Sequence, residues 1–240
     1  PRRTGSTVIA LMLGLAFVLG TTTLIESQKG ALDRSLKKAL SADIVINSAE
    51  EVNSKTYRFN AETVSKITSL PEVARADPLR IFSLPFDGQE IVVLSHDMDA
   101  YFDIAPDILD DGDGAAARAA TARGEGMLAS RNFAARWKLS LGDVVTLETP
   151  TGPLSLPIVG LLDYYRSQTG TIFFDRSLLA RFWHDTDADY VLLDLKDGVD
   201  HGLARSKIEN VLRGGQRAFV YTHEEYRRWG GDVVDQFFGL

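Results

Sequence analysis

The sequence predicts an α+β protein in which a transmembrane helix and a stalk precede an extracytoplasmic α/β domain with a small inserted subdomain. Three observations predict this class. Residues 5–25 carry no charged side chain. A strand–helix–strand pattern occurs twice, once within 43–94 and once within 189–221. Between these two, the segment 127–183 contains short strands separated by turns, a pattern typical of a mixed, mainly antiparallel unit.

Residues 5–25 are long enough for a membrane span. As a helix they would extend roughly 30 Å, the thickness of the hydrocarbon core of a bilayer. Arg2 and Arg3 precede the stretch and Glu26 is the first charge after it, which favours a domain outside the plasma membrane. A signal peptide would have a shorter apolar core and a small-residue cleavage site, and a buried core helix would be shorter and amphipathic. We therefore predict a transmembrane helix at 1–25.

The next segment has an amphipathic helical pattern. Leu32, Leu36 and Leu40 recur every four residues, with basic residues around the other faces. We interpret 26–40 as a stalk helix that continues the membrane helix into the aqueous space. An ordinary surface helix would show the same pattern, and both interpretations stay open here.

The first strand–helix–strand unit begins with the β-branched run 43–47. Asn60 is a good N-cap for a helix that ends at Pro71, and the chain is then extended over 75–86, interrupted by prolines. Asp87-Gly88 predicts a hairpin turn into a strand at 90–94. The unit therefore reads as strand, helix, strand, strand.

The second unit begins with a strand at 189–195 and ends with a strand at 218–221. Between them we expect a helix whose buried face includes Leu203, Ile208, Val211 and Leu212, ended by Gly214. We predict that the two units pair in one sheet and form a discontinuous core domain, 41–98 and 188–222. The inserted subdomain would then be 99–187, with Ser130 capping one of its short helices.

An acidic segment at 107–114 invites a calcium interpretation. It does not fit the calcium-loop template, because oxygen ligands do not alternate and no Glu closes the loop at its twelfth position. A solvated acidic loop is the better interpretation. We expect alanine substitutions there to leave stability unchanged, and the Ala/Arg tract at 115–123 to be a surface helix or loop.

The last segment, 223–240, becomes more apolar toward its end. Thr222 and Glu225 form a capping-box pattern at its start. We interpret this segment as a return stalk that leads toward a further membrane helix. Its aromatic residues suit either a membrane interface or a packed core.

Composition and motifs exclude several functions. Formal net charge is −7 without a dense basic patch, so a nucleic-acid partner is not expected. The absence of cysteine excludes disulfides, thiolate metal sites and thiol nucleophiles. His96-Asp97 and His184-Asp185 are adjacent pairs, whose side chains point to opposite faces in a strand, and no nucleophile elbow or phosphate loop occurs. The sequence therefore predicts no enzyme and no catalytic, cofactor-binding or metal-binding residues.

These residues resemble the MacB/FtsX-like permease subunits of ABC transporters, over nearly the whole chain. The most specific part is 126–134 with 137–145, continued through Gly152 and 159–165. Supporting parts are 42–46 and 70–73, which follow the apolar stretch. The resemblance implies a MacB-like periplasmic core domain between two membrane helices, in a segment of a longer permease located in the inner (plasma) membrane.

The resemblance also implies a function and partners. The expected function is to couple ATP-driven motion of the stalks to export or extraction of a lipid, lipoprotein or peptide-like cargo. Expected partners are an ATP-binding subunit, a second permease subunit, and a lipid, lipoprotein or periplasmic adaptor. The alternative is a membrane-tethered extracytoplasmic sensor or receptor domain, which would share the single span and the mixed α/β domain.

Overall fold

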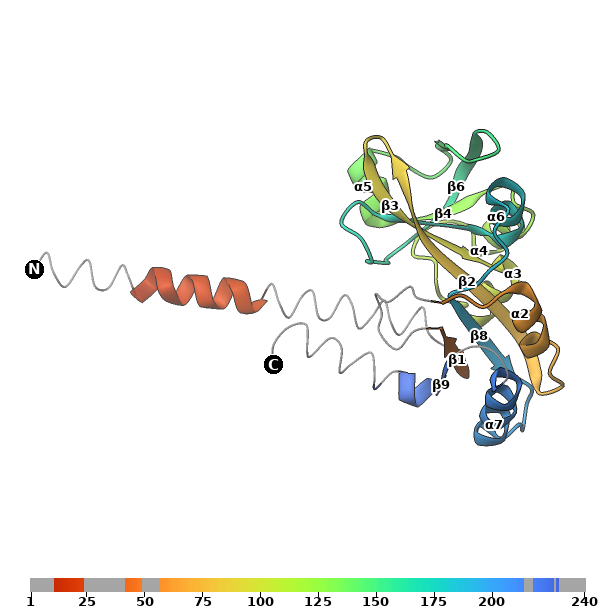
Figure 1. The fold of residues 1–240 in the computed structure, drawn as a ribbon. Helices are drawn as coiled ribbons and strands as arrows, with labels where there is room; N and C mark the ends of the chain where they lie inside the picture. The colour runs from red at the N-terminus through yellow and green to blue at the C-terminus, as the bar shows by residue number, and fades with distance from the viewer. Residues whose placement is uncertain (1–10, 24–41, 49–56, 214–217, 227, 229–240) are drawn as a thin grey trace, which may run out of the picture.

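The computed structural model of the chain describes residues 11–23, 42–48, 57–213, 218–226 and 228. Its framework is one mixed sheet of nine strands, in the order β5-β6-β4-β7-β3-β2-β8-β1-β9 (Figure 1). The predicted class, two strand–helix–strand halves in one sheet with an inserted α/β unit, is confirmed. The strands are β1 Ile44–Asn47, β2 Val73–Phe86, β3 Gln89–His96, β4 Met127–Ser130, β5 Val144–Leu147, β6 Leu154–Leu162, β7 Thr171–Asp175, β8 Tyr190–Leu195 and β9 Phe219–Thr222. The helices of the domain include α2 Ala61–Thr68, α3 Met98–Ile104, α4 Gly114–Ala122, α5 Arg131–Trp137, α6 Arg176–Trp183 and α7 His201–Leu212.

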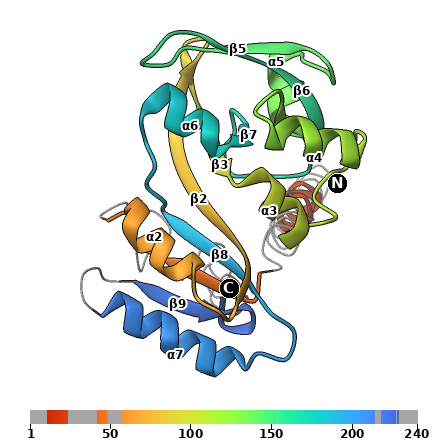
Figure 2. The same ribbon diagram turned by 90° about the vertical axis from the view of Figure 1, so that its right-hand side faces the viewer.

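The first lobe is formed by β1, β8, β9, the first half of β2, and helices α2 and α7. β8 lies between β1 and β2 and is antiparallel to both, while β1 lies between β8 and β9 and is antiparallel to both. The two strand–helix–strand units are therefore interleaved, which is the split βαβ arrangement. Helices α2 and α7 lie side by side on one face of this sheet (Figure 2).

Local signals explain the helices of this lobe. The Asn60 side chain accepts a hydrogen bond from the Thr63 amide at 2.8 Å, as an N-cap does, and Val64 and Ile67 are buried. Helix α7 buries Ala204, Ile208 and Leu212, residues that recur every four positions. The prediction that Leu203 faces inward is wrong. Its side chain is 54% exposed, because it precedes the buried stripe by one position, a rotation of about 100° around a helix.

The second lobe contains the second half of β2 with β3, β4, β5, β6 and β7, and helices α3, α4, α5 and α6. β5 and β6 form an antiparallel hairpin, whereas β3–β7 and β4–β6 are parallel pairs. Ser130 caps α5 as expected, and the Ala/Arg tract forms α4. The domain bounds 41–98, 188–222 and 99–187 stay a prediction. Strand β3, inside the first of these ranges, pairs with β7 of the second lobe.

Strand β2 joins the lobes. It is 14 residues long and continues through both of its prolines. Its residues 73–79 pair with β8, and its residues 80–86 pair with β3. Asp87 and Gly88 both have positive φ, as the predicted tight hairpin between β2 and β3 requires. One strand thus belongs to both lobes and changes its partner between Leu79 and Arg80.

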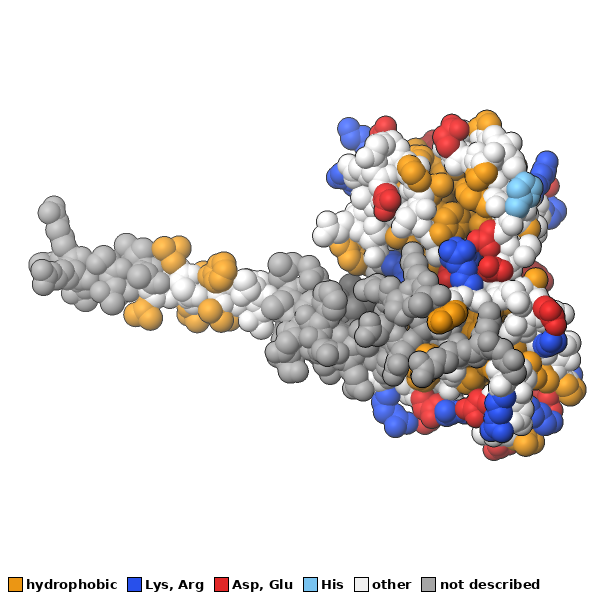
Figure 3. Space-filling view, viewed as in Figure 1, with side chains coloured by type: hydrophobic (Ala, Val, Ile, Leu, Met, Phe, Trp, Pro, Cys, Tyr) orange, Lys and Arg blue, Asp and Glu red, His pale blue; other side chains and the backbone are white. Residues whose placement is uncertain are grey.

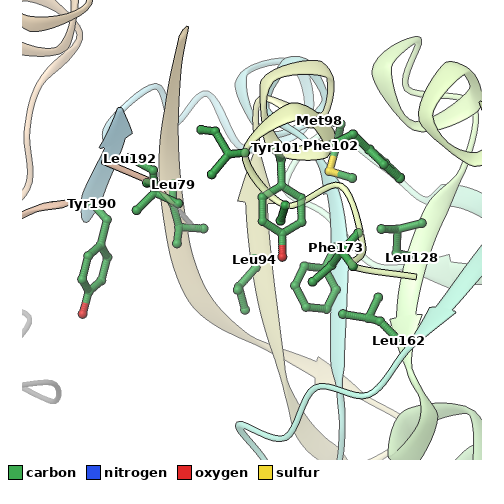
Figure 4. Close-up of a cluster of buried hydrophobic side chains, with 14 of the residues drawn as sticks. Leu79, Leu94, Met98, Tyr101, Phe102, Leu128, Leu162, Phe173, Tyr190 and Leu192 are labelled. Carbon is green, nitrogen blue, oxygen red and sulfur yellow. The ribbon is translucent and has the colours of Figure 1, made fainter. Parts of the chain in front are cut away.

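Three apolar clusters fill the domain. One lies between the first-lobe sheet and α2 and α7, and a second lies between the second-lobe sheet and α5 and α6. The third, called the shared core here, contains residues of both lobes. Figure 4 shows Tyr190, Leu79 and Leu192 at one end of the shared core, and Leu128 and Leu162 at the other. The lobes are therefore continuous through apolar contact as well as through β2.

The predicted transmembrane helix is not confirmed. Residues 11–23 are helical, and their large apolar side chains are 57–73% exposed. Within the described part of the chain, no helix combines the length and the apolar character needed to cross a bilayer. Residues 1–10 and 24–25, the predicted stalk at 26–40, and the predicted return stalk beyond residue 226, apart from residue 228, lie outside the described residues.

Gly170 gives a test of the packing between the start of β7 and α5. Its φ is +101°, and a Cβ there would lie 2.4 Å from the Phe133 Cβ. Gly170→Ala should lower the free energy of unfolding by about 2–4 kcal/mol, through overpacking and an unfavourable backbone conformation. Gly152→Ala is the control, because its φ is +118° but the space around it is open. Equal losses for the two variants in urea unfolding would contradict the packing argument.

Candidate functional site

The lobes meet at a buried arginine. The waist is defined here as residues 78–81 of β2 together with the loop 184–189. The Arg80 side chain is buried, and its Nε donates to the Asp185 Oδ2 at 2.9 Å while its Nη1 donates to the Asp189 Oδ2 at 2.7 Å. Burial alone would lower the pKa of Arg80, but the two carboxylates outweigh it and raise that pKa. The guanidinium therefore stays charged and holds the loop against β2.

A second arginine holds the same loop from the other side. Arg176, the first residue of α6, donates to the backbone oxygens of Pro78 at 2.8 Å and of Thr186 at 2.7 Å. Burial lowers its pKa from the ordinary arginine value, although nearby carboxylates including Asp77 oppose that shift. Two guanidinium groups thus fix the connection between the lobes. Arg80 bonds to the loop through two nitrogens, and Arg176 bonds to β2 through one nitrogen and to the loop through another.

Next to the waist lies a buried histidine–aspartate pair. The His96 Nδ1 is 2.6 Å from the Asp77 Oδ2, and both side chains are buried. The other Asp77 oxygen accepts from the Asp97 amide at 2.8 Å, and the His96 ring stacks on Tyr101 with centroids 3.9 Å apart. The pair joins β2, β3 and α3. Sequence reasoning missed it, because the only signal was one carboxylate inside an apolar strand.

The residues considered for catalysis do not come together. Asp97 caps α3 rather than facing His96, and Asp185 binds Arg80 rather than His184. Ser83 of β2 and Ser95 of β3 are candidate nucleophiles by residue type alone, and in the described part of the chain neither side chain makes a hydrogen bond to a histidine. The buried polar groups at the waist mainly bond to one another and to backbone, so they position chain segments.

Two carboxylates of the acidic segment 107–114 accept hydrogen bonds from backbone amides. The Asp113 side chain accepts from the amides of Ala115 and Ala116 and caps α4, and Asp110 accepts from the Asp163 amide. Among the described residues, no group of three or more His, Asp or Glu side chains is arranged to hold a metal ion. Because Asp113 caps α4, alanine at that position should lower stability, so the expectation that alanine leaves stability unchanged does not hold at every position of this segment.

The chain enters and leaves the domain at one place. Ile44 of β1 lies opposite Thr222 of β9 in the antiparallel pair. The predicted capping box is confirmed: Glu225 N lies 3.4 Å from the Thr222 hydroxyl, and Thr222 N donates to the Glu225 carboxylate at 3.0 Å. This hydrogen bond, followed by the pairing of Glu225 with Arg205, outweighs burial and lowers the pKa of Glu225. Residues 223–226 begin a helix there.

Neither sign of charge dominates the described residues of the face shown in Figure 3. In the face shown in Figure 3, acidic and basic side chains are interspersed over the domain, and hydrophobic side chains gather on the helix at 11–23.

The buried arginine can be tested by stability. Arg80→Met keeps the stem volume but leaves Asp189 buried without its cation, so the free energy of unfolding should fall by about 3–5 kcal/mol. Arg123→Met is the control, since Arg123 and Glu125 form an exposed pair worth about 1 kcal/mol or less. The double variant Arg80→Met/Asp189→Asn should recover part of the loss in urea unfolding. A loss at Arg80 no larger than that at Arg123 would refute the structural role of the pair.

The acidic segment makes a separate prediction. Asp113→Ala should cost about 1 kcal/mol through the lost helix cap, and Asp113→Asn should cost little because Asn also caps helices. Asp107→Ala, at an exposed position, should change stability by about 0.5 kcal/mol or less. Adding calcium should leave the melting temperature of the unsubstituted chain unchanged. A rise of several degrees with calcium would instead indicate a metal site.

Comparison with known proteins agrees with this architecture. The chain is 22% identical over 242 residues to an uncharacterized ABC transporter permease protein of Mycobacterium tuberculosis, a match that covers 99% of the chain and 28% of the relative. The chain thus spans 28% of the length of this curated relative. Its fold is similar to the periplasmic region of MacB from Actinobacillus actinomycetemcomitans, with a TM-score of 0.57, 11% identity, and coverage of 85% of the chain and 95% of that structure.

A second solved structure shares the fold. The extracellular domain of the noncanonic ABC-type transporter YknZ from Gram-positive bacteria matches with a TM-score of 0.51 and 15% identity, over 75% of the chain and 99% of that structure. The model of the MacB-like periplasmic core domain family matches residues 4–211. That match includes both lobes, from β1 through most of α7, and it extends over most of the chain. The chain therefore belongs to the MacB-like periplasmic core domain family.

Proposed function

We propose that the chain is the extracytoplasmic domain, with its flanking segments, of a permease subunit of an ABC transporter in the inner (plasma) membrane. In this role the domain receives ATP-driven motion through the segments that enter and leave it. It uses that motion to export or extract a lipid, lipoprotein or peptide-like cargo. The domain itself catalyses no reaction. An ATP-binding subunit and a second permease subunit would complete the transporter, with a lipid, lipoprotein or periplasmic adaptor as a further partner.

The observation that carries the proposal is the position of the chain entry and exit. Because β1 and β9 are antiparallel neighbours, the start of β1 and the end of β9 lie side by side at the same end of the two strands. A domain inserted between two membrane helices requires this arrangement, since both helices must reach one bilayer. The charge-free stretch 5–25 before the entry supports a membrane segment on that side.

The family and the relatives support the transporter class. The relative from M. tuberculosis is named an ABC transporter permease protein, and the two similar structures come from proteins named MacB and an ABC-type transporter. The polar groups of the waist support the non-enzymatic part of the proposal. Arg80 and Arg176 are both engaged in bonds that hold the two lobes together, and such bonds suit a domain that transmits motion.

The location of the domain can be tested with single cysteines, because the chain has none of its own. Leu203→Cys places a thiol at an exposed position, and Ala204→Cys is the control at a neighbouring buried position. In intact cells that make the full-length protein, with any cysteine outside residues 1–240 replaced, a membrane-impermeant maleimide should label the first variant and not the second. Labelling of Leu203→Cys only after the membrane is permeabilised would contradict an extracytoplasmic domain.

The transporter class needs a second experiment. A tagged full-length protein, purified in detergent from its native host, should bring with it an ATP-binding subunit, and the complex should hydrolyse ATP. Copurification of a signalling module without ATPase activity would contradict the proposal and favour the sensor or receptor alternative. If Arg80→Met copurifies with the same partners as the unsubstituted protein but its complex hydrolyses ATP more slowly, that result would support transmission of motion through the waist.

A further inference from the structure

We propose that the helical turn at 223–226 is a latch, which closes over the chain entry at residues 42–43 and opens as a unit while the sheet stays intact. The inference rests on the proposed function, because the segment beyond the latch is the one that a membrane helix would move. The turn makes contact with three separate parts of the domain. One contact is a set of hydrogen bonds, one is a solvent-exposed ion pair and one is a buried ring, and this combination favours a turn that can open and close.

The first contact is with the chain entry. The His223 amide donates to the Asp43 backbone oxygen at 3.0 Å, and the His223 Nδ1 lies 3.3 Å from the Ala42 backbone oxygen. These bonds extend the β1–β9 pairing by one residue beyond its last registered pair, Ile44 and Thr222. The turn therefore lies directly against the residues that lead into β1. Ala42 is fully buried and belongs to the shared core.

The second contact is an ion pair with α7. The Arg205 Nη1 donates to both oxygens of Glu225, at 2.8 and 2.9 Å. The Arg205 and Glu225 side chains are 36% and 39% exposed, and ion pairs with this much access to water add little net stability. Glu225 also accepts from the Thr222 amide, so the pair orients the turn against α7. It does so without anchoring the turn strongly.

The third contact is one buried ring. Tyr226 is the only buried residue of the described turn, with 8% of its surface exposed. Its ring packs edge-on against Tyr221 of β9, with centroids 5.8 Å apart, and its hydroxyl is hydrogen-bonded to Tyr190 of β8. Burial raises its pKa above the ordinary tyrosine value, although the nearby Arg166 guanidinium opposes that shift. A single aromatic side chain therefore anchors the turn to the shared core.

The contacts of β9 and those of the turn differ, and this difference indicates that the turn can separate from the domain while β9 stays paired. The four residues of β9 are held to β1 by backbone pairing, whereas the contacts of the turn after them with the described residues include one buried ring, one exposed ion pair and the His223 bonds. Opening of the turn would break the His223 bonds to the backbone oxygens of Asp43 and Ala42 and separate Tyr226 from Tyr190. Tyr190 belongs to β8, and β8 pairs with β2, the strand that joins both lobes, so the turn is connected to β2 through Tyr190.

The latch can be tested with a pair of matched cysteines in the otherwise cysteine-free chain. Ala42→Cys places a thiol at the chain entry, next to His223 of the latch, and Ala117→Cys places one in α4. Both positions belong to the shared core and are at most 1% exposed. The rate of maleimide labelling of each thiol is measured in the 240-residue chain, without and with Tyr226→Ala. Labelling of a buried thiol reports opening of the region that covers it.

Tyr226→Ala should raise the labelling rate of Ala42→Cys by at least about tenfold and leave that of Ala117→Cys unchanged, since only the local unit is released. Tyr226→Phe, which keeps the ring, should change the rate by about twofold or less. Glu225→Gln provides a milder variant. Gln keeps the capping box but loses the ion pair, so the rate at position 42 should rise about threefold. An equal rise at both thiols, or no rise at either, would overturn the latch.

A second arm uses the assembled transporter. During ATP hydrolysis the labelling rate of Ala42→Cys should rise relative to the nucleotide-free complex, while that of Ala117→Cys should stay constant. A complex that hydrolyses ATP without any change at position 42 would overturn the latch and leave the proposed function standing. If no ATP-binding subunit copurifies, the proposed function fails, and the Tyr226 variants of the isolated chain still decide whether the turn opens as a unit.

Discussion

The fold depends on how β2 changes its partner without leaving backbone groups unpaired. Where β8 ends its pairing with β2, the next backbone groups of β2 would lose their partners inside the protein. The Asp189 carboxylate accepts from the Ile81 amide at 2.7 Å, and Arg176 donates to the Pro78 oxygen at 2.8 Å. Pro78 has no amide to satisfy. Side chains therefore complete the hydrogen bonding that the departing strand leaves open, which a buried backbone requires.

This role explains why charges lie inside the waist at all. Taking an ion pair out of water costs about as much as its attraction returns, so a buried pair is poor evidence for stability as such. Arg80 and Asp189 do more than attract each other, because Asp189 also binds the Ile81 amide and Arg80 also binds the Ile81 oxygen. The pair thus fixes the register at which β2 leaves one lobe and enters the other. His96 and Asp77 add a second fixed point close to it.

Sequence predicted those features that depend on residues a few positions apart. Asn60, Asp87-Gly88 and the Thr222–Glu225 box were identified because caps and turns are local. The pairing of the two units in one sheet also followed from their pattern, whereas their interleaved strand order did not. The site did not, since its pairs are separated by 19 residues for Asp77 and His96 and by 109 for Arg80 and Asp189. Leu203 was misplaced because neighbouring apolar residues offered two possible buried stripes, and tertiary contact selected the other one.

The difference in strength between waist and latch determines which part yields first to a force on the exit segment. Breaking a buried ion pair costs about 3–5 kcal/mol, whereas an exposed pair such as Arg205–Glu225 contributes about 0.2–1 kcal/mol. The buried Tyr226 ring adds about 1.5–3 kcal/mol to the turn, but the waist is also backed by the shared core, so a pull on residues 223–226 should act on the turn before it deforms the crossing of β2. Because the lobes also share one apolar core, they should move as one body while the turn changes its position. Motion would then be passed on by the orientation of the whole domain, with the latch setting how tightly that orientation follows the exit segment.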